Sequence, residues 1–139
     1  QESRGLGDVY KRQQLVSRVK IIPLEVVVRN VVAGSLTKRI GWEEGRCLKE
    51  PTVEFYYKND DLGDPLLNEN HIELLELATT HEIKDLREQA LKINDFLTKR
   101  FDKIDLQFID FKLEFGRQSN GSLILADEIS PDTCRLWDR

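Results

Sequence analysis

Apolar and polar residues follow two different periods along this chain, and each period predicts a type of element. Alternation of apolar and polar residues, together with β-branched runs, predicts strands at Leu15–Lys20, Leu24–Arg29, Val53–Lys58, Leu106–Phe115 and Leu123–Glu128. After Thr79, apolar residues recur every three or four positions, which predicts a long helix that ends near Phe101. Shorter helices are expected at Leu36–Ile40 and from Asn68 to Leu77. Because strands and helices are interspersed, the predicted fold class is α+β.

Residues that favour the ends of helices and strands lie at the expected boundaries. Ser35 is suited to cap the start of the first short helix, and Gly41 is suited to the left-handed conformation that follows its end. Thr79 and Glu82 form a T-x-x-E capping box at the start of the long helix. Pro23 is expected to end the first strand, because proline has no backbone N–H to donate to a neighbouring strand.

The two ends of the chain show neither period. Residues 1–13 are polar and resemble a non-native, adapter-derived segment, so they are left out of the fold prediction; a native extended terminus is the alternative. Residues Ile129–Arg139 are expected to be irregular. A weak linker at Lys20–Pro23 predicts that two lobes meet there, with most of the first lobe missing.

Composition and charge exclude several classes of function. The chain has 139 residues with 21 basic and 25 acidic residues in mixed order, so we expect no binding of nucleic acid. Cys47 and Cys134 lack the spacing of zinc ligands and fit free thiols in a cytoplasmic protein. The most apolar stretch, Ile21–Ala33, is interrupted by charged residues and is too short to cross a membrane.

The predicted strand at Leu106–Phe115 carries the most informative charges. In its last six residues, apolar and charged side chains alternate strictly, so the two kinds face opposite sides of the sheet. We expect one set to be buried, namely Phe111, Leu113 and Phe115. The other set would face away from the core, namely Asp110, Lys112 and Glu114.

A tight turn at Asn120-Gly121 would set the register of a hairpin with the next strand. Asn-Gly favours a two-residue type I′ turn, and that turn would place Glu114 directly opposite Asp127. Facing side chains have Cβ atoms about 5 Å apart, so two carboxylates there repel each other. A bound Mg²⁺ would relieve this repulsion, since Mg²⁺ prefers carboxylate oxygens and substrate phosphates. The alternative is a solvated charged face without a ligand.

Candidate anion-binding residues lie elsewhere in the chain. Arg29 ends an apolar strand shortly before the helix that Ser35 begins, which suits a phosphate, although a simple helix cap explains the same residues. Lys58 lies at the end of a predicted strand and Asp64 lies in the loop beyond it, where turn formation alone would explain the acidic residues. Arg135 lies in the tail, and nothing in its surrounding sequence indicates a role.

Four separate blocks resemble one known family in the same order. The stretches IIPLEVVVRNVVAGS (residues 21–35), KNDDLGDP (58–65), FIDFKLEFG (108–116) and LADEISPDTCRLWD (125–138) are similar to those of SAICAR synthetases. The resemblance implies a two-lobed ATP-binding fold. Residues 14–22 would end a kinase-like β lobe and form the hinge, and residues 23–139 would form the ATP- and ribotide-binding lobe, truncated at its C-terminus.

The resemblance also implies a reaction and its participants. The family uses ATP, with Mg²⁺, to join L-aspartate to carboxyaminoimidazole ribotide in purine biosynthesis, through an acyl phosphate. The intact protein would bind these small molecules and could form a homo-oligomer. This chain alone is expected to have little activity without the first lobe. A small-molecule kinase with a similar cleft and a non-catalytic binding module are the alternatives.

Residue roles are carried over from the resemblance position by position. It implies Mg²⁺ ligands at Glu114 and Asp127, and a clamp on the ribotide phosphate at Arg29, Ser35 and Arg135. It implies catalytic contacts at Lys112, Asp110 and Asp64. It implies nucleotide contacts at Lys58 and, through the hinge backbone, at Val19, Lys20 and Ile21.

Overall fold

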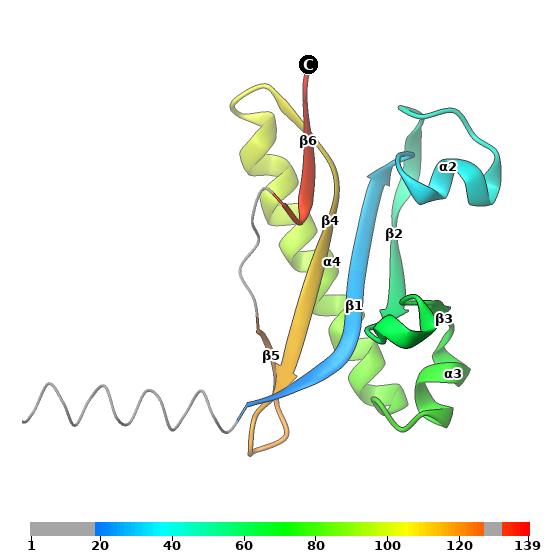
Figure 1. Ribbon diagram of the computed structural model, residues 1–139. Coiled ribbons are helices and arrows are strands. Elements are labelled where there is room, and N and C mark those ends of the chain that lie inside the picture. Colours follow the sequence, from blue (N-terminus) through cyan, green and yellow to red (C-terminus); the bar gives the residue numbers. More distant parts are fainter. Residues whose placement is uncertain (1–18, 127–131) are drawn as a thin grey trace, which may run out of the picture.

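A computed structural model of the chain, which describes residues 19–126 and 132–139, contains one antiparallel sheet with a long helix along one face (Figure 1). The strands are β1 (Lys20–Val31), β2 (Cys47–Tyr57), β3 (Leu66–Leu67), β4 (Leu106–Arg117), β5 (Leu123–Leu125) and β6 (Cys134–Asp138). The helices are α2 (Ser35–Ile40), the 3-10 turn η1 (Asp60–Leu62), α3 (Glu69–Leu74) and α4 (Thr80–Asp102). The sheet order is β3-β2-β1-β4-β5, with β6 also paired to β4. The α+β prediction is confirmed.

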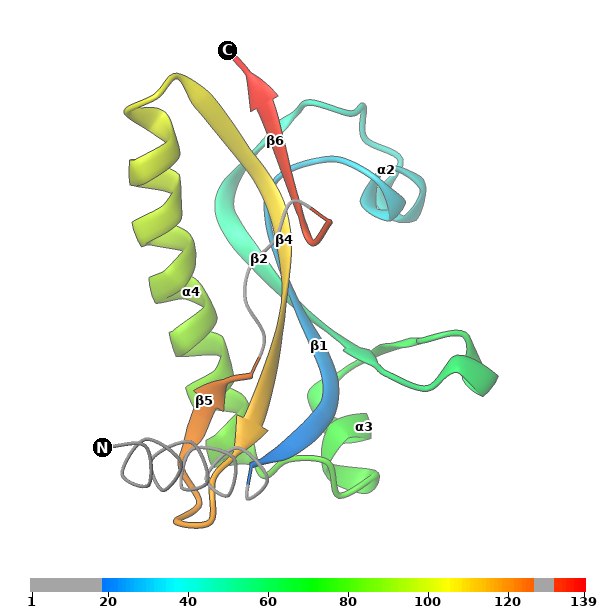
Figure 2. The same ribbon diagram turned by 60° about the vertical axis from the view of Figure 1, so that its left-hand side comes forward.

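The core lies between the sheet and α4, which runs along the sheet in Figure 2. Val26 and Val28 of β1 stand opposite Leu113 and Phe111 of β4, and all four side chains are buried. The predicted stripe of α4 packs against them, with Ile83, Leu86 and Ala90 buried and Ile93, Leu97 and Phe101 partly buried. Burying each large side chain stabilises the fold by about 1.5–3 kcal/mol. This packing fixes which face of each strand is apolar.

A pair of asparagines, of which Asn94 is buried and Asn30 partly buried, fixes α4 against β1. The amide of Asn30 donates to Asn94 Oδ1 at 2.8 Å, and the amide of Asn94 donates back to Asn30 Oδ1 at 2.9 Å. Asn94 is buried among apolar residues of α4, where a polar group without a partner would be costly. The reciprocal pair therefore favours a single register of the helix on the sheet.

The start of α4 carries the predicted capping box. The Thr79 hydroxyl accepts the Glu82 N–H, and the Glu82 carboxylate accepts the Thr79 N–H at 3.0 Å. Glu82 also accepts two hydrogen bonds from Arg117 of β4, at 2.7 and 2.9 Å. The bond from Arg117 lowers the pKa of Glu82 below its ordinary value. One carboxylate thus both caps the helix and ties it to the end of the sheet.

Replacing Glu82 with alanine is expected to lower the free energy of unfolding by about 1–2 kcal/mol, because a cap and a partly buried ion pair are lost together. The ionised form stabilises the fold above the ordinary pKa of a glutamate, and this contribution is lost as the pH falls through the lowered pKa. Urea unfolding at pH 7 and about pH 3 measures the effect, with exposed Glu88→Ala as the control. A difference between parent and Glu82→Ala that does not shrink at low pH would contradict it.

Two expected strand boundaries are wrong, namely the end of the first strand at Lys20 and the start of the second at Leu24. Pro23 does not break a strand, because β1 is continuous from Lys20 to Val31. The pairing of β1 with β4 shifts between Ile21 and Glu25, so Pro23 lies at an irregularity where its missing N–H costs little. Its carbonyl accepts the N–H of Lys58 at 2.9 Å. Residues 15–18 of the first expected strand lie outside the described residues.

Several other elements differ in length from those predicted, and some were not predicted at all. β2 begins at Cys47 rather than Val53, and the added residues extend beyond β3, where the edge tolerates a proline. The predicted short helix ends at Leu74 instead of Leu77. The loop before it contains η1 and β3. In the tail, which was expected to be irregular, β6 pairs with β4.

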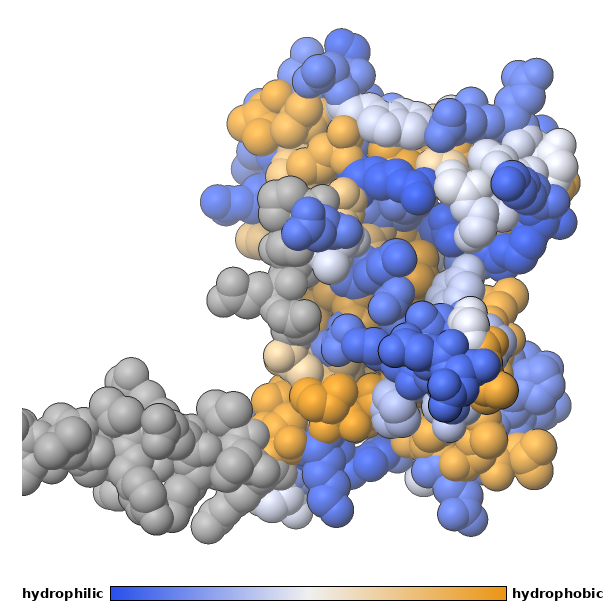
Figure 3. Space-filling view, in the orientation of Figure 1, coloured by the Kyte–Doolittle hydropathy of each residue, from blue (hydrophilic) through white to orange (hydrophobic). Residues whose placement is uncertain are grey.

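Polar and apolar surfaces are separated on the face of the sheet opposite α4. In Figure 3, hydrophilic residues cross the middle of this face, and hydrophobic residues gather at the upper left and along its lower end. Two exposed apolar side chains belong to strand ends there, with Ile21 at 54% and Leu125 at 38% exposure. In the part of the chain that the structure describes, no helix has the length and apolar character needed to cross a membrane.

Candidate active site

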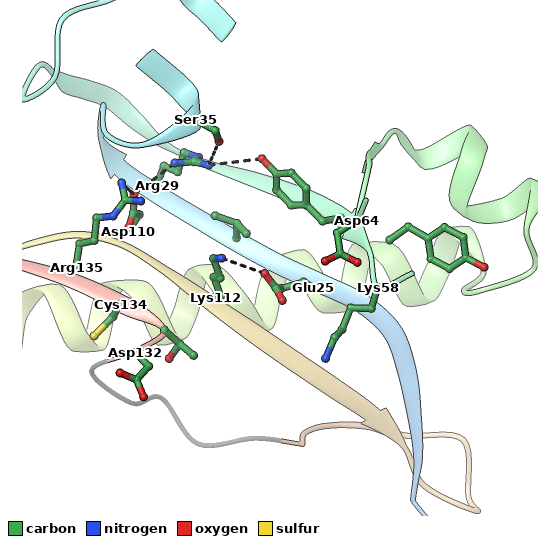
Figure 4. A pocket seen from close by; sticks show the side chains of 14 residues that line it. Glu25, Arg29, Ser35, Lys58, Asp64, Asp110, Lys112, Asp132, Cys134 and Arg135 are labelled. Atoms are coloured by element: carbon green, nitrogen blue, oxygen red, sulfur yellow. Dashed lines mark hydrogen bonds and ion pairs between the residues drawn. The ribbon is translucent and has the colours of Figure 1, made fainter. Parts of the chain in front are cut away.

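The polar face of the sheet is built from odd-numbered residues of β1 and even-numbered residues of β4. Their register places Arg29 opposite Asp110, Val27 opposite Lys112, and Glu25 opposite Glu114. A pocket of about 420 Å³ opens on this face (Figure 4). It is lined by Glu25, Val27, Arg29, Ser35, Tyr56, Tyr57, Lys58, Asp64, Asp110, Lys112, Asp132, Thr133, Cys134 and Arg135.

Arg29 is buried at one end of this pocket and is held from several sides. Its Nε donates to Glu54 at 2.6 Å, and its Nη1 donates to the Ala33 carbonyl at 3.1 Å. Its Nη2 donates to the hydroxyl of Ser35 at 3.1 Å (Figure 4). Burial alone would lower the pKa of Arg29, but hydrogen bonds to Glu54 and Tyr56 outweigh burial and raise it. The guanidinium is therefore a fixed, fully charged donor.

Arg135 joins Arg29 from β6, on the opposite side of Asp110. One oxygen of the Asp110 carboxylate accepts from both guanidinium groups, each at 3.4 Å. Burial raises the pKa of Asp110, although the two arginines and Lys112 act against it. The carboxylate thus keeps two guanidinium groups close together at a site that is partly shielded from solvent. We call Arg29, Ser35 and Arg135 the anion clamp, because their donors converge on one end of the pocket.

Gly34 makes room for Arg135. Its backbone has φ 58° and ψ −136°, a conformation that only glycine adopts readily. A Cβ atom at this position would lie 2.5 Å from both Nη1 and Nη2 of Arg135. The glycine before α2 therefore serves the approach of a guanidinium as well as the turn of the chain.

Replacing Gly34 with alanine is expected to displace Arg135 and weaken the binding of inorganic phosphate about tenfold, since a tenfold loss corresponds to one charge-assisted hydrogen bond. Gly41→Ala is the matched control, because Gly41 also has a positive φ of 70° but nothing within 4 Å of the added atom. Calorimetric titration of the 139-residue chain with phosphate measures the difference. Equal phosphate affinity in the two variants would contradict this role.

Ser35 differs from its expected local role. Gly34 occupies the N-cap position of α2, Ser35 is the first helical residue, and its side chain makes no capping bond. Its hydroxyl instead accepts from Arg29, because the unusual backbone of Gly34 turns the helix start toward β1. Gly41 does end α2 in the left-handed conformation, as predicted.

Four charged side chains alternate in sign at the other end of the pocket. Lys58 contacts Glu114 at 2.5 Å, and Lys112 contacts Glu25 at 3.5 Å. The hydrogen bond to Glu114 raises the pKa of Lys58. Glu25 and Glu114 face each other across β1 and β4, so each carboxylate has a lysine that offsets the repulsion. The structure therefore does contain two facing acids, but between different strands than predicted.

The predicted hairpin register is wrong by one residue. β4 and β5 pair Arg117 with Leu123, and Gln118 and Ser122 close a three-residue loop in which Gly121 has φ 86°. This is a turn followed by a left-handed glycine, the other common solution for a short hairpin. Continuing the register brings Ala126 to Glu114, whose carbonyl accepts the Ala126 N–H at 2.9 Å. Asp127 lies outside the described residues.

Asp64 lies at the rim of the pocket and also shapes its own loop. Its Oδ1 accepts the backbone N–H of Asn59 at 2.8 Å, and its φ of 48° is one that aspartate tolerates better than most residues. Turn formation, as expected from the sequence, therefore explains why an acid is present at this position. Its carboxylate nevertheless lines the pocket, so one residue can serve both purposes.

Most of the predicted site residues come together in this pocket. Those that line it are Arg29, Ser35, Lys58, Asp64, Asp110, Lys112 and Arg135. Glu114 adjoins the lining through Lys58. Val19, Lys20 and Ile21 do not line it; they lie where β1 begins, beside the end of β4. Among the described residues, no group of three or more acidic, histidine or cysteine side chains is arranged to hold a metal.

Several pocket residues were not predicted from the sequence. Glu25 belongs to a β-branched run that indicates a buried strand, so its exposed face was overlooked. Tyr56 alternates with buried Phe55 in β2, and this alternation could have indicated a side chain on the polar face. Cys134 lines the pocket from β6, and burial together with nearby Asp110 raises its pKa, so it is a poor nucleophile.

Comparison with known proteins decides which family has this arrangement. The sequence profile of the family described as SAICAR synthetase matches residues 3–139. The chain belongs to the SAICAR synthetase family. Phosphoribosylaminoimidazole-succinocarboxamide synthase of Anoxybacillus flavithermus is 68% identical over 126 residues, which are 91% of this chain and 52% of that protein. The enzyme of the same name from Staphylococcus saprophyticus is 55% identical over 137 residues, 99% of this chain and 59% of that protein.

Solved structures of SAICAR synthetases have the same fold. One in complex with ADP superposes with a TM-score of 0.84 at 55% identity, over 86% of this chain and 51% of that chain. SAICAR synthase from Saccharomyces cerevisiae complexed with SAICAR superposes with a TM-score of 0.71 at 25% identity, over 86% of this chain and 43% of that chain. The chain thus spans about half the length of the relatives it matches. The predicted fold, part of a SAICAR synthetase-like architecture, is confirmed.

Proposed function

We propose that the intact protein is an ATP-dependent ligase that forms an amide between L-aspartate and carboxyaminoimidazole ribotide in purine biosynthesis. The observation that carries the proposal is one pocket with a fixed cationic clamp at one end and alternating lysines and carboxylates at the other. This separation suits a substrate with its own phosphate, bound away from the phosphates of a nucleotide. The close relatives bear the name of this enzyme.

The ribotide phosphate is assigned to the anion clamp. Arginine binds phosphate through two parallel N–H donors, and a hydroxyl can add a third bond. Arg29, Ser35 and Arg135 provide these donors from three different elements, so they can surround an anion. Asp110 between the two guanidinium groups keeps them together when no anion is bound.

The nucleotide is assigned to the opposite end, near Lys58 and Glu114. A related structure holds ADP, which supports nucleotide binding by this family. On the ground of the family resemblance, and not of the hairpin register, Glu114 and Asp127 would hold Mg²⁺, a cation that commonly takes one or two carboxylates together with substrate phosphates. Bound there, Mg²⁺ would supply charge stabilisation to the transferred phosphoryl group. Lys58 would then leave Glu114 and contact the nucleotide phosphates.

The chemistry follows from the reactive groups of the three substrates, which would meet in the middle of the pocket. A carboxylate oxygen of the ribotide attacks the γ-phosphorus of ATP, forming an acyl phosphate and ADP. The amine of aspartate then attacks the acyl carbon, and inorganic phosphate leaves as the amide forms. Lys112 would neutralise the reacting carboxylate or phosphoryl oxygens, supported by Asp110, while Asp64 would orient an amine. The hinge backbone at Val19–Ile21 would contact the adenine.

The experiment requires the segments that this chain lacks relative to its relatives. Residues 14–139 would replace the matching part of the Anoxybacillus flavithermus protein, and we call this chimera the restored enzyme. We expect ADP release that requires both L-aspartate and the ribotide. ADP release without aspartate would favour a kinase, and no ATP turnover at all would contradict the proposed ligase. The 139-residue chain alone, without the other lobe, is expected to be nearly inactive.

A further inference from the structure

Behind the anion clamp lies a carboxylate, Glu54, that does not line the pocket. We propose that Glu54 is a positioning residue that aims the Arg29 guanidinium at the bound anion, an inference that rests on the function proposed above. Glu54 comes from β2, opposite Val27, and its side chain is 12% exposed. It is therefore placed to act on the anion indirectly, above all through Arg29.

Glu54 uses both carboxylate oxygens. Oε1 accepts from Arg29 Nε at 2.6 Å and from the Tyr56 hydroxyl at 3.2 Å. Oε2 lies 2.5 Å from Nη2 of Arg39, a residue of α2. Arg39 also donates to the Tyr56 hydroxyl at 3.1 Å. Arg29 and Tyr56 thus hold Oε1, whereas the partly exposed Arg39 binds only the other oxygen.

The hydrogen bond from Nε to Glu54 determines which other N–H groups of Arg29 face a ligand. Glu54 occupies Nε, whereas Nη1 is taken by Ala33 and Asp110. The Nη2 end points toward Ser35 and Tyr56, which both line the pocket. A guanidinium is planar, so fixing one edge fixes the direction of the others. Glu54 therefore selects the edge of Arg29 that faces the pocket.

The surrounding charges form an alternating series across the sheet. In order, Arg39, Glu54, Arg29, Asp110 and Arg135 each contact the next residue of opposite sign. Three cations and two anions leave one net positive charge. Removing Glu54 would raise that excess, so Coulomb attraction alone predicts tighter binding of phosphate. Loss of positioning predicts weaker binding instead, so the two effects change the phosphate affinity in opposite directions.

The test uses the 139-residue chain and inorganic phosphate as the probe. Glu54→Gln keeps the shape of the side chain but not its charge, so the ion pair with Arg29 is lost while a hydrogen bond from the charged Nε to the amide oxygen can remain. We expect phosphate affinity to fall about threefold in Glu54→Gln and about tenfold in Glu54→Ala. The NMR signal of the Arg29 Nε–H should shift in the same order. Glu50→Ala, on the exposed part of the same strand, is the control and should bind like the parent.

A second variant separates charge from position. Arg39→Gln lowers the net charge by one but leaves Glu54 bound to Arg29, so phosphate affinity should stay within about twofold of the parent. In the restored enzyme, Glu54→Gln should raise the KM for the ribotide and leave the KM for ATP unchanged. Equal or tighter phosphate binding in both Glu54 variants would overturn the inference but not the proposed function. No phosphate binding by the parent chain would overturn the inference together with the assignment of the anion clamp to a phosphate.

Discussion

Replacing Arg29 with glutamine should raise the KM of the restored enzyme for the ribotide at least a hundredfold. The variant loses the central donor of the anion clamp, and it leaves Glu54 and Asp110 without the cation they share. Breaking a buried ion pair by removing one partner costs about 3–5 kcal/mol, so the free energy of unfolding should fall as well. Steady-state kinetics and urea unfolding measure the two effects.

The matched control for this variant is Arg39→Gln. Arg39 contacts the same carboxylate but has a side chain that is 34% exposed and does not line the pocket. Its loss should lower stability by about 1 kcal/mol, because the pair is only partly exposed and Glu54 keeps its bond to Arg29, and should leave the KM for the ribotide nearly unchanged. Similar values of the KM for the ribotide in the two variants would contradict a direct role of Arg29 in binding the ribotide phosphate.

Replacing Glu114 with glutamine should lower the kcat of the restored enzyme by about 10²–10³-fold, with little change in stability. The large effect on rate follows if Glu114 holds the cation that stabilises the transferred phosphoryl group. Stability should hardly change, because the pair of Glu114 with Lys58 is partly exposed, at 24% and 41%. Turnover as a function of Mg²⁺ concentration, beside thermal unfolding, measures both quantities.

Glu69→Gln is the control for the second prediction, because Glu69 also pairs with a cation, Arg87, but lies away from the pocket. It should leave turnover and its Mg²⁺ dependence at the level of the parent. A Glu114→Gln variant that keeps the rate of the parent would remove the support for a metal at this end of the pocket.

Local sequence signals predicted the elements whose causes are themselves local. The capping box of Thr79 and Glu82 acts within one turn, and α4 begins where it does for that reason. The alternation in β4 follows from the pleat of a strand, so the buried face of Phe111, Leu113 and Phe115 is as expected. The long helix and the polar face of the sheet could thus be predicted from the sequence.

Features that depend on distant residues could not be predicted in this way. Pro23 was expected to end a strand, but pairing with β4 extends β1 through it. β6 has a weak pattern of its own and forms because the edge of β4 is available to it. The hairpin register depended on a choice between a two-residue and a three-residue loop, and Asn120-Gly121 is compatible with both.

The residues of the candidate site likewise depend on neighbours that are distant in the sequence. The family resemblance, not the local pattern, indicated Arg135, which reaches the pocket only through the pairing of β6 with β4. Glu54 and Glu25 were not predicted, because their roles arise from neighbours across the sheet: Arg29 for the first and Glu114 for the second. The sequence alone does not show which charged residues of separate strands become neighbours.

The central claim is that the pocket binds a ribotide phosphate at one end and a nucleotide at the other. A crystal structure of the restored enzyme with ADP and the ribotide product tests it most directly. We predict that the product phosphate contacts Arg29, Ser35 and Arg135, and that the ADP phosphates lie beside Lys58 and Glu114. A product phosphate found beside Lys58 and Glu114, with the clamp unused, would contradict the account.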